Sequence, residues 1–439
     1  MALPELAPAE LEAVADAPLT APVIGGYSAV SWLQAQARLG PVFSTTALGE
    51  PCVVVTGSEA NRTLWRSPDD WSYRDTDAGT FFCRQMGEDH VSALDGEPHR
   101  RLRKLILPAF GIGAMQRDLA TAVTVLDQGV RRAVEEGSQS RDLYGFLTRL
   151  LARVLTRTQV KSAPADALLE RLCAFEEDFI FGQQIPLPDQ DRWFARPEYL
   201  ALKRDAFDYF RSVATARAEG ERAEDSLQLL LDRPPPAGAP PLTPSEQAEA
   251  VYLLSVAGVG NIANLVCPLV YSLQDTQWPQ RLREELEAAD LADPEVLRSL
   301  SVLPALQRET ERLFAPAPII PKRATRDVEL LGQPVDAGAL VMHLHTLWQF
   351  DPQHFDAPLE FRPERWLADA PIKPNAFGGG KHLCLGMGVT RVLLPLVVAA
   401  LYRYAEPRAL ETPVQVPLDP AFTPSPVTTR MVTRLDTRR

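Results

Sequence analysis

Long stretches of the chain place apolar residues at every third or fourth position, the spacing of one face of an α-helix. This spacing predicts helices at residues 100–110, 117–160, 163–184, 278–289, 301–314 and 386–404. Short runs rich in β-branched residues predict strands at residues 51–57, 327–331 and 339–345. Because helices outnumber strands, the pattern predicts a mainly α fold with a small β portion.

The longest apolar segment follows a proline-rich loop and begins with clear helix-start signals. Thr243 is the expected N-cap, Pro244 occupies the first helical position, and Glu246 completes a capping box. The apolar pattern predicts one helix from Pro244 to about Ser272. Because its second half is apolar on nearly all sides, we expect this helix to cross the core of a large domain.

Within this predicted helix the stretch AGVGNIANLV, residues 257–266, holds residues that a buried helix disfavours. An interior glycine such as Gly258 or Gly260 costs roughly 0.5–1 kcal/mol relative to alanine. A buried asparagine such as Asn261 needs hydrogen-bond partners for its amide. The stretch is therefore either a packing accommodation or part of a site.

Composition and charge narrow the class of protein. The 439 residues carry a formal net charge of −12, which argues against nucleic-acid binding because that function needs a positive surface. The sequence shows neither a signal peptide nor a run of about 20 apolar residues. We therefore expect a cytoplasmic protein that does not enter a membrane. The pattern favours one large domain at residues 46–439, with residues 1–45 packed on it as an N-terminal extension.

The five cysteines lack the spacing of zinc or iron–sulfur sites, but Cys384 has an unusual setting. It lies in FGGGKHLCLG, residues 377–386, where glycines let the backbone fold closely round a sulfur atom. A helix expected just after it would direct N–H groups at a negative charge. A phosphate-binding loop is disfavoured because His382 stands where Ser or Thr is required. The pattern matches a buried, charge-stabilised thiolate, which is what a thiolate ligand to iron would need; the alternative is a glycine-rich turn with a core cysteine.

The same stretch resembles the F-x-x-G-x-x-x-C-x-G motif of the cytochrome P-450 superfamily, with Phe377, Gly380, Cys384 and Gly386 in register. The resemblance extends over about residues 50–435. It implies the cytochrome P-450 fold, a single large mainly α domain with a small sheet. It also implies heme b (iron protoporphyrin IX) as cofactor, with Cys384 as the ligand of the heme iron. Phe377, Gly378 and Gly386 would then surround the thiolate.

Two further motifs follow the order of that family. Glu309 and Arg312 form an E-x-x-R pair, whose spacing puts both side chains on one helix face. FRPERW, residues 361–366, resembles the family's F-x-P-x-R element and supplies Arg365. The resemblance implies that these three residues form a buried structural network behind the heme.

Cationic residues are expected at the two heme carboxylates, where charged donors suit such partners. DGEPHRRLRKLILPAF, residues 95–110, resembles the family's H-x-x-x-R helix and supplies His99 and Arg103. The resemblance also implies His382 and Arg323 for this role. Lys322 is a competing candidate beside Arg323.

The predicted long helix departs from the family at its oxygen-activating motif, [A/G]-G-x-[D/E]-T. Gly258 stands at the position of the oxygen groove, but Gly260 and Asn261 replace the proton-delivering acid and alcohol. These three are the candidate catalytic residues. Asn261 still offers a donor and an acceptor, so a monooxygenase that uses dioxygen is one interpretation. The alternatives are peroxide isomerisation or dehydration, oxidative coupling, or a non-catalytic heme or ligand-binding protein.

Partners and substrate-contacting residues are inferred from the resemblance to the family, by their positions in the sequence. Ferredoxin and ferredoxin reductase are the implied electron donors, and the basic strip RRLRK, residues 100–104, would suit docking of an acidic ferredoxin. The acidic run at residues 176–178 is expected to be a solvated helix face. An apolar pocket suited to a small apolar natural product is expected. Its candidate lining residues are Phe81, Phe82, Met86, Phe179, Ala257, Ile320 and Phe422.

Overall fold

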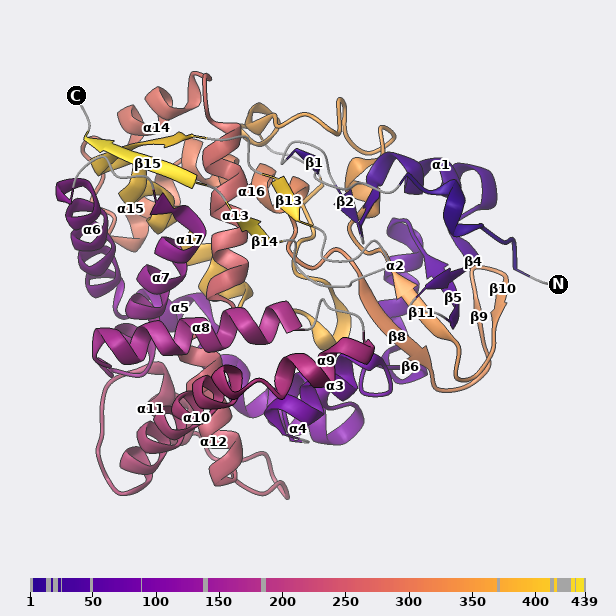
Figure 1. Ribbon diagram of the computed structural model, residues 1–439, viewed down its shortest axis with the longest axis horizontal. Coiled ribbons are helices and arrows are strands. Elements are labelled where there is room, and N and C mark those ends of the chain that lie inside the picture. The colour runs from indigo at the N-terminus through magenta and orange to yellow at the C-terminus, as the bar shows by residue number, and fades with distance from the viewer. Residues whose placement is uncertain are drawn as a thin grey trace.

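The computed structural model has helices in most of the molecule and gathers its main sheet at one side, near the N-terminus (Figure 1). Phe422, expected in the substrate pocket, lies outside the residues that the structure describes. The described residues are 3–437, apart from 13–16, 19–22, 25, 48–49, 88, 137–140, 183–186, 369–371, 411–413, 417–427 and 431.

The helices confirm the mainly α prediction, and each predicted helical segment overlaps at least one of them. A helix that the spacing did not single out, α10, follows α8 and packs on it. The helices are α1 Ala29–Leu39, α2 Ser58–Arg66, α3 Asp77–Met86, α4 Gly96–Ile106, α5 Ile112–Gln116, α6 Leu119–Glu135, α7 Leu143–Gln159, α8 Asp166–Gly182, α9 Leu187–Phe194, α10 Pro197–Ala218, α11 Ser226–Leu231, α12 Pro244–Ser255, α13 Val259–Ser272, α14 Trp278–Leu286, α15 Pro294–Ser299, α16 Val302–Leu313 and α17 Met387–Tyr404.

The strands form small sheets, the largest being five-stranded in the order β4-β5-β11-β8-β6. Strands β5 and β11 pair in parallel, and the other neighbours in this sheet are antiparallel. The strands are β1 Ala17–Pro18, β2 Val23–Ile24, β3 Tyr27–Ser28, β4 Val42–Ala47, β5 Glu50–Val55, β6 Trp71–Ser72, β7 Arg141–Asp142, β8 Ile320–Ala324, β9 Val328–Leu330, β10 Gln333–Val335, β11 Leu340–His343, β12 Ala405–Ala409, β13 Val414–Val416, β14 Thr428–Arg430 and β15 Val432–Thr437.

The N-terminal segment shares a core with the main sheet. Trp32 of α1 is fully buried in one hydrophobic cluster with Phe43 of β4 and Met342 of β11. The boundary expected between residues 45 and 46 falls inside β4. The residues before it therefore supply α1 to this core and most of the edge strand β4 to the main sheet.

The central helix is interrupted, so the prediction of one continuous helix from Pro244 to Ser272 is wrong. Helix α12 ends at Ser255, and α13 begins at Val259 after a short turn. Gly258 closes this turn with φ 82°, a left-handed conformation that suits glycine. The predicted start of α12 is confirmed, because Thr243 and Glu246 form both hydrogen bonds of a capping box.

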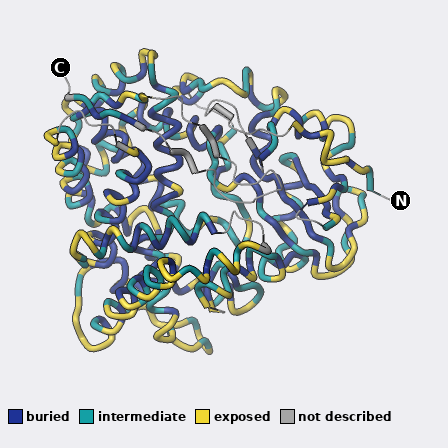
Figure 2. Tube along the Cα trace, in the orientation of Figure 1, coloured by how far each residue is buried: buried dark blue, intermediate teal, exposed yellow. Residues whose placement is uncertain are grey.

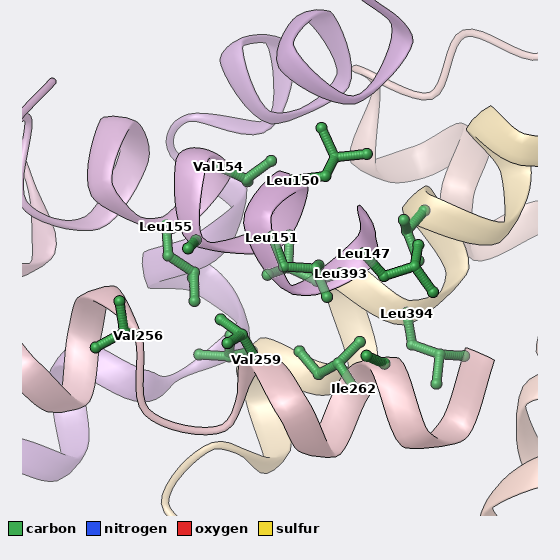
Figure 3. Packing of buried hydrophobic residues seen from close by; sticks show 14 of the residues in the cluster. Leu147, Leu150, Leu151, Val154, Leu155, Val256, Val259, Ile262, Leu393 and Leu394 are labelled. Atoms are coloured by element: carbon green, nitrogen blue, oxygen red, sulfur yellow. The ribbon is translucent and has the colours of Figure 1, made fainter. Parts of the chain in front are cut away.

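Helices α7, α13 and α17 meet at the centre of the hydrophobic core. Leu151 of α7, Ile262 of α13 and Leu393 of α17 belong to one buried cluster (Figure 3). Two segments, Pro244–Ser272 and Met387–Tyr404, are long and apolar enough to cross a membrane, but 72% and 67% of their most apolar windows are buried inside the protein. Figure 2 shows these central helices as largely buried, so they have the character of core helices.

Candidate functional site

Cys384 lies in a tight loop between a 3-10 turn, Gly380–His382, and the start of α17. The loop is closed by a hydrogen bond from the Cys384 N–H to the Phe377 carbonyl, 3.0 Å, and by another from the Leu383 N–H to the Gly380 carbonyl, 3.3 Å. Gly380 has φ 66°, a conformation that residues with side chains rarely adopt. The sequence therefore folds round the sulfur as its glycines predict.

Glycine is also required in this loop because an aromatic ring packs directly on it. A Cβ atom at Gly379 would lie 2.5 Å from the indole ring of Trp65, on α2. Arg391 of α17 lies over the Phe377 ring, with its guanidinium carbon 5.5 Å from the ring centroid. The loop is thus held by contacts with α2 and α17.

The Cys384 thiol combines an accessible side chain with dense protein surroundings. The residue is exposed, yet burial raises the pKa of its thiol. The backbone N–H groups of Gly386 and Met387 and the charge of Arg103 act in the opposite direction and stabilise the thiolate. Arg103 also donates a hydrogen bond to the Leu383 carbonyl. These donors suit a thiolate that a metal ion holds deprotonated.

A cluster of imidazole and ammonium groups lies beside this loop. The rings of His99 and His382 stack with centroids 4.2 Å apart. His382 Nε2 lies 3.1 Å from an Asp95 carboxylate oxygen, and Lys381 Nζ lies 3.5 Å from the same oxygen. Burial acts to raise the pKa of Asp95, but hydrogen bonds from His382 and from backbone and hydroxyl donors hold that pKa well below its usual range.

Two buried nitrogens at this cluster have no hydrogen-bond partner among the described residues, Nδ1 of His99 and Nε1 of Trp65. Buried polar atoms are normally paired, so each calls for a polar partner. Burial and neighbouring cations lower the pKa of His99 to about 3. A carboxylate bound close to the ring would raise this pKa again. Sequence analysis missed Trp65, because its distance along the chain from the other residues gave no signal.

Strand β8 separates the two basic candidates, Lys322 and Arg323, because successive strand residues face opposite sides. Lys322 is buried, and burial followed by the nearby charge of Lys381 lowers its pKa to about 8. Arg323 instead pairs with Glu50 at 2.7 Å and donates to the carbonyls of Asp75 and Gly338. The structure brings Lys322, and not Arg323, to the cluster.

These residues fit a heme. The accessible thiol of Cys384 offers the iron a ligand, and amide groups already stabilise its negative charge. The unpartnered nitrogens of His99 and Trp65, together with Lys322, suit the two heme carboxylates. The ligand for the iron and the partners for the carboxylates thus come from neighbouring parts of one site.

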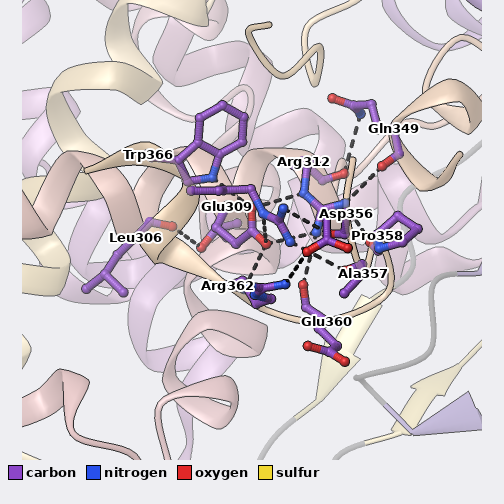
Figure 4. A network of polar contacts seen from close by, with 12 residues as sticks. Leu306, Glu309, Arg312, Gln349, Asp356, Ala357, Pro358, Glu360, Arg362 and Trp366 are labelled. Atoms are coloured by element: carbon purple, nitrogen blue, oxygen red, sulfur yellow. Dashed lines mark hydrogen bonds and ion pairs between the residues drawn. The ribbon is translucent and has the colours of Figure 1, made fainter. Parts of the chain in front are cut away.

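Glu309 and Arg312 belong to a buried network of polar contacts (Figure 4), which Arg365 joins through Glu309. Arg312 donates to both carboxylate oxygens of Glu309, at 2.8 and 3.0 Å, and neither side chain is exposed. Arg365 donates to Glu309 at 3.1 Å, and so does the Trp366 indole at 2.7 Å. Arg312 also donates to carbonyls in the segment 349–360. The network joins α16 to the chain that leads into the Cys384 loop.

The three candidate catalytic residues lie in or just after the turn between α12 and α13. Asn261 is exposed although the following nine residues of α13 are buried, and Ala257 and Gly258 are half-buried. Gly260 faces away, where a Cβ atom would lie 2.6 Å from the Tyr144 hydroxyl oxygen. The structure thus brings Gly258 and Asn261 to an accessible surface and packs Gly260 against α7.

Glu176 of α8 is buried, so the expectation of a solvated face at residues 176–178 is wrong for this residue. Its carboxylate accepts a hydrogen bond from the Tyr252 hydroxyl at 2.9 Å and another from the Gly258 N–H. Burial raises the pKa of Glu176 to about 7. The sequence held a signal, because Leu169, Leu172 and Phe179 place Glu176 on the apolar face of its helix.

Several of the expected pocket residues form one aromatic cluster. The Phe179 ring lies 5.0 Å from that of Phe81 and 5.6 Å from that of Phe82. Met86 packs against the same core and is half-buried. Ile320 lies apart from them, beside the Cys384 loop, where its Cδ1 atom is 3.1 Å from a Cβ position at Gly378.

Comparisons with known proteins agree with this geometry. The family model for cytochrome P450 matches residues 26–406. A putative cytochrome P450 139 of Mycobacterium bovis is 26% identical over 411 residues, covering 86% of this chain and 89% of that protein. The cyclooctat-9-en-7-ol 5-monooxygenase of Streptomyces melanosporofaciens is 26% identical over 343 residues, covering 73% of this chain and 72% of that protein.

Among solved structures, a retinoic acid-bound cyanobacterial CYP120A1 has a TM-score of 0.75 at 22% identity, and the match covers 92% of this chain and 93% of that one. That likeness concerns the fold, and it agrees with the family match over residues 26–406. The chain therefore belongs to the cytochrome P450 family.

Proposed function

We propose that this protein is a heme b monooxygenase, which oxidises a small apolar substrate with dioxygen and electrons from a ferredoxin system in the cytoplasm. The observation that carries the proposal is the accessible Cys384 thiol, supported by the amide groups of Gly386 and Met387. When bound, a heme-thiolate group supplies the redox chemistry that monooxygenation requires. The relative named as a cyclooctat-9-en-7-ol 5-monooxygenase supports this reaction class.

In this proposal the chain holds the cofactor at two places. Cys384 would bind the iron, and the Arg103 charge beside it would help to keep the sulfur anionic. His99, Lys322 and the Trp65 indole would hold the heme carboxylates by hydrogen bonds and charge. The network round Glu309 fixes the backbone that precedes the Cys384 loop.

The substrate would lie against Phe82, the half-buried member of an aromatic cluster whose other rings, Phe81 and Phe179, are buried. These rings pack within 6 Å of one another and present little charge, which favours an apolar molecule and excludes water. Asn261 adds an accessible amide near the start of α13. This amide can orient a water molecule or a polar substrate group through its donor and its acceptor.

The ferredoxin proposal rests on the basic strip of α4. Arg101 is engaged with Glu246 at 2.6 Å, and Arg103 points to the Cys384 loop. Arg100 and Lys104 are exposed. Exposed cations on the helix that reaches the Cys384 loop suit an acidic electron donor.

A second candidate function is chemistry on a peroxide-bearing substrate, which needs no electron donor. The observation that favours it is that α13 carries no acid or alcohol at positions 260 and 261. The two functions differ in the oxidant that supports turnover.

Two measurements test the proposal in sequence. Reduced protein treated with carbon monoxide should show the Soret band of thiolate-ligated heme, and Cys384→Ser should lose it. Cys83→Ser, at a half-buried position on α3, serves as the matched control and should keep the band. Product should then form with dioxygen, spinach ferredoxin, its reductase and NADPH in a screen of apolar terpenes. Turnover with cumene hydroperoxide and none with dioxygen would instead support the second candidate.

A further inference from the structure

We propose that Glu176 and Tyr252 form a displaced acid–hydroxyl pair that delivers protons to the wall of the site made by Gly258 and Asn261. The proposal rests on the proposed monooxygenase function. It places the acid on α8 and the hydroxyl on α12, in place of the two side chains that positions 260 and 261 of α13 lack.

The contacts of Glu176 hold its carboxyl group at the turn between α12 and α13. The Tyr252 hydroxyl donates to Oε2 at 2.9 Å, and the Gly258 N–H donates to the same carboxyl group. Gly258 is free to do so because the turn breaks the helical hydrogen-bond ladder, where the N–H groups of Val256 and Ala257 both bond to the Tyr252 carbonyl. The helix break thus fixes an acid at Gly258, three residues before the exposed Asn261.

The partners of Glu176 allow it to exist in both protonation states. Its two hydrogen-bond donors are neutral, and burial raises its pKa to about 7. The titratable groups that face it from the packed elements are Tyr252 of α12, Tyr199 of α10 and Tyr144 of α7. A carboxyl group that only capped the Gly258 N–H could be replaced by an amide. An acid that gains and loses a proton near neutral pH can also transfer protons, which an amide cannot do.

Two further titratable groups, His90 and Glu249, lie next to this pair. Glu249 Oε1 accepts a hydrogen bond from the Val91 N–H at 2.7 Å and lies 3.6 Å from His90 Nε2. His90 Nδ1 accepts from the Ser92 N–H, which assigns the ring proton to Nε2, toward Glu249. The His90 and Tyr252 rings pack against each other, with their centroids 6.1 Å apart.

Position 260 of α13 has no room for an acid, which explains why another helix supplies one. A Cβ atom at Gly260 would lie 2.6 Å from the Tyr144 hydroxyl oxygen, so no carboxylate fits there while Tyr144 keeps its place. Tyr144 is buried, as is Glu176. Helix α8 packs on α7, so the acid comes from an element that already contacts this region.

The proton balance of the reaction defines what the pair must do. Monooxygenation converts a C–H bond, dioxygen, two electrons and two protons into a C–OH group and one water. The electrons come from the ferredoxin-type donor, and the protons come from solvent. For each proton, Glu176 gives up its own and takes the Tyr252 hydroxyl proton, and Tyr252 takes a proton from solvent. The chain returns to its starting state.

Infrared difference spectroscopy of the heme-loaded protein tests the acid directly, without turnover. The wild type should show a carboxylic-acid band that titrates with a midpoint near pH 7, as burial of Glu176 implies. Glu176→Gln should remove the band, whereas Glu170→Gln, at an exposed position of the same helix, should keep it. Tyr252→Phe should raise the midpoint, because the Tyr252 hydrogen bond lowers the pKa of Glu176. A spectrum with no band that Glu176→Gln removes would overturn the proposal.

Dioxygen consumption with spinach ferredoxin, its reductase and NADPH tests the relay. Glu176→Gln and Tyr252→Phe should each slow consumption at least about tenfold and change its pH profile and its solvent isotope effect, since proton transfer contributes on the order of 10²–10⁴ to rates. Glu170→Gln should match the wild type. Equal rates and pH profiles in all four proteins would assign Glu176 a capping role and overturn the relay. A wild type that consumes no dioxygen would instead contradict the proposed function, while the infrared titration still reports on Glu176.

Discussion

Gly260 and Tyr144 form a close contact, and a substitution at position 260 should reveal its effect on stability. A Cβ atom at position 260 would lie 2.6 Å from the buried Tyr144 hydroxyl oxygen and 3.7 Å from the ring carbon that bears it. We expect Gly260→Ala to lower the free energy of unfolding by about 1–3 kcal/mol, the usual effect of overpacking. Tyr144→Phe removes only the oxygen, so it should recover part of that loss in the double variant.

Urea denaturation of the two single variants and the double variant measures this coupling. Gly113→Ala is the matched control, because a Cβ atom there would meet nothing within 4 Å. Additive effects at Gly260 and Tyr144 would show that α13 and α7 adjust their spacing instead, and would contradict the steric account.

The sequence could reveal a site residue when the neighbours of that residue lie close to it along the chain. The surroundings of Cys384 were predictable, since the glycines and the helix start that support its sulfur are all within ten residues of it. Glu176 was assigned to solvent because its acidic neighbours outweighed its place on the apolar face. Trp65 contacts the Cys384 loop from more than 300 positions away, and only the folded chain brings the two together.

At the scale of elements, helix periodicity was predictable and helix interruption was not. The apolar pattern is continuous from Pro244 to Ser272, and it gives no position for the break. The break at Gly258 arises from left-handed backbone geometry and from the bond of its N–H to Glu176, a tertiary contact. Strand β8 was also missed, because its residues IPKRA alternate little in polarity.

The network that joins α16 to the segment before Cys384 yields a prediction for Glu309. Its carboxylate compensates two arginines and accepts from the Trp366 indole, all in a buried setting. Glu309→Gln removes that charge and leaves Arg312 buried without its counterion. Breaking a buried pair costs about 3–5 kcal/mol, so we expect a loss of that order in stability.

Urea denaturation and the ratio of Soret absorbance to total protein measure the outcome for Glu309→Gln. Heme content should fall with stability, because the network fixes the backbone before the Cys384 loop. Glu360→Gln, an exposed glutamate of the same segment, should behave as the wild type. A stable Glu309→Gln protein with full heme content would refute the structural role assigned to the network.

At the scale of the whole molecule, the buried titratable groups have opposite effects on stability. Carboxyl groups such as Glu176 and Glu249 have raised pKa values, about 7 and about 8, because of burial. Histidines such as His90, whose pKa burial lowers to about 3, have the reverse effect. The native state binds protons more tightly than the unfolded chain at the two glutamates and less tightly at the histidine. As the pH rises, the glutamates therefore lower the free energy of unfolding and the histidine raises it, and the stability of the protein is the sum of the two effects.

The contribution of Glu176 to this balance can be isolated with one variant. The pKa of its carboxyl group rises from 4.5 in the unfolded chain to about 7 in the folded protein. Between these values the folded state holds a proton that the unfolded state has released, so stability falls as the pH rises and is level above about 8. Because one pKa unit corresponds to about 1.4 kcal/mol, the loss is on the order of 3 kcal/mol.

Glu176→Gln keeps an acceptor for the Tyr252 hydroxyl and the Gly258 N–H but cannot ionise, so it should not show this loss. Relative to the wild type, its free energy of unfolding should increase steadily from pH 5 to pH 8 and then stay constant. Urea denaturation of the heme-loaded proteins at several pH values measures the difference, and Glu170→Gln should run parallel to the wild type. Parallel curves for Glu176→Gln and the wild type would mean that Glu176 is ionised throughout this range, which the burial and neutral partners of its carboxyl group argue against.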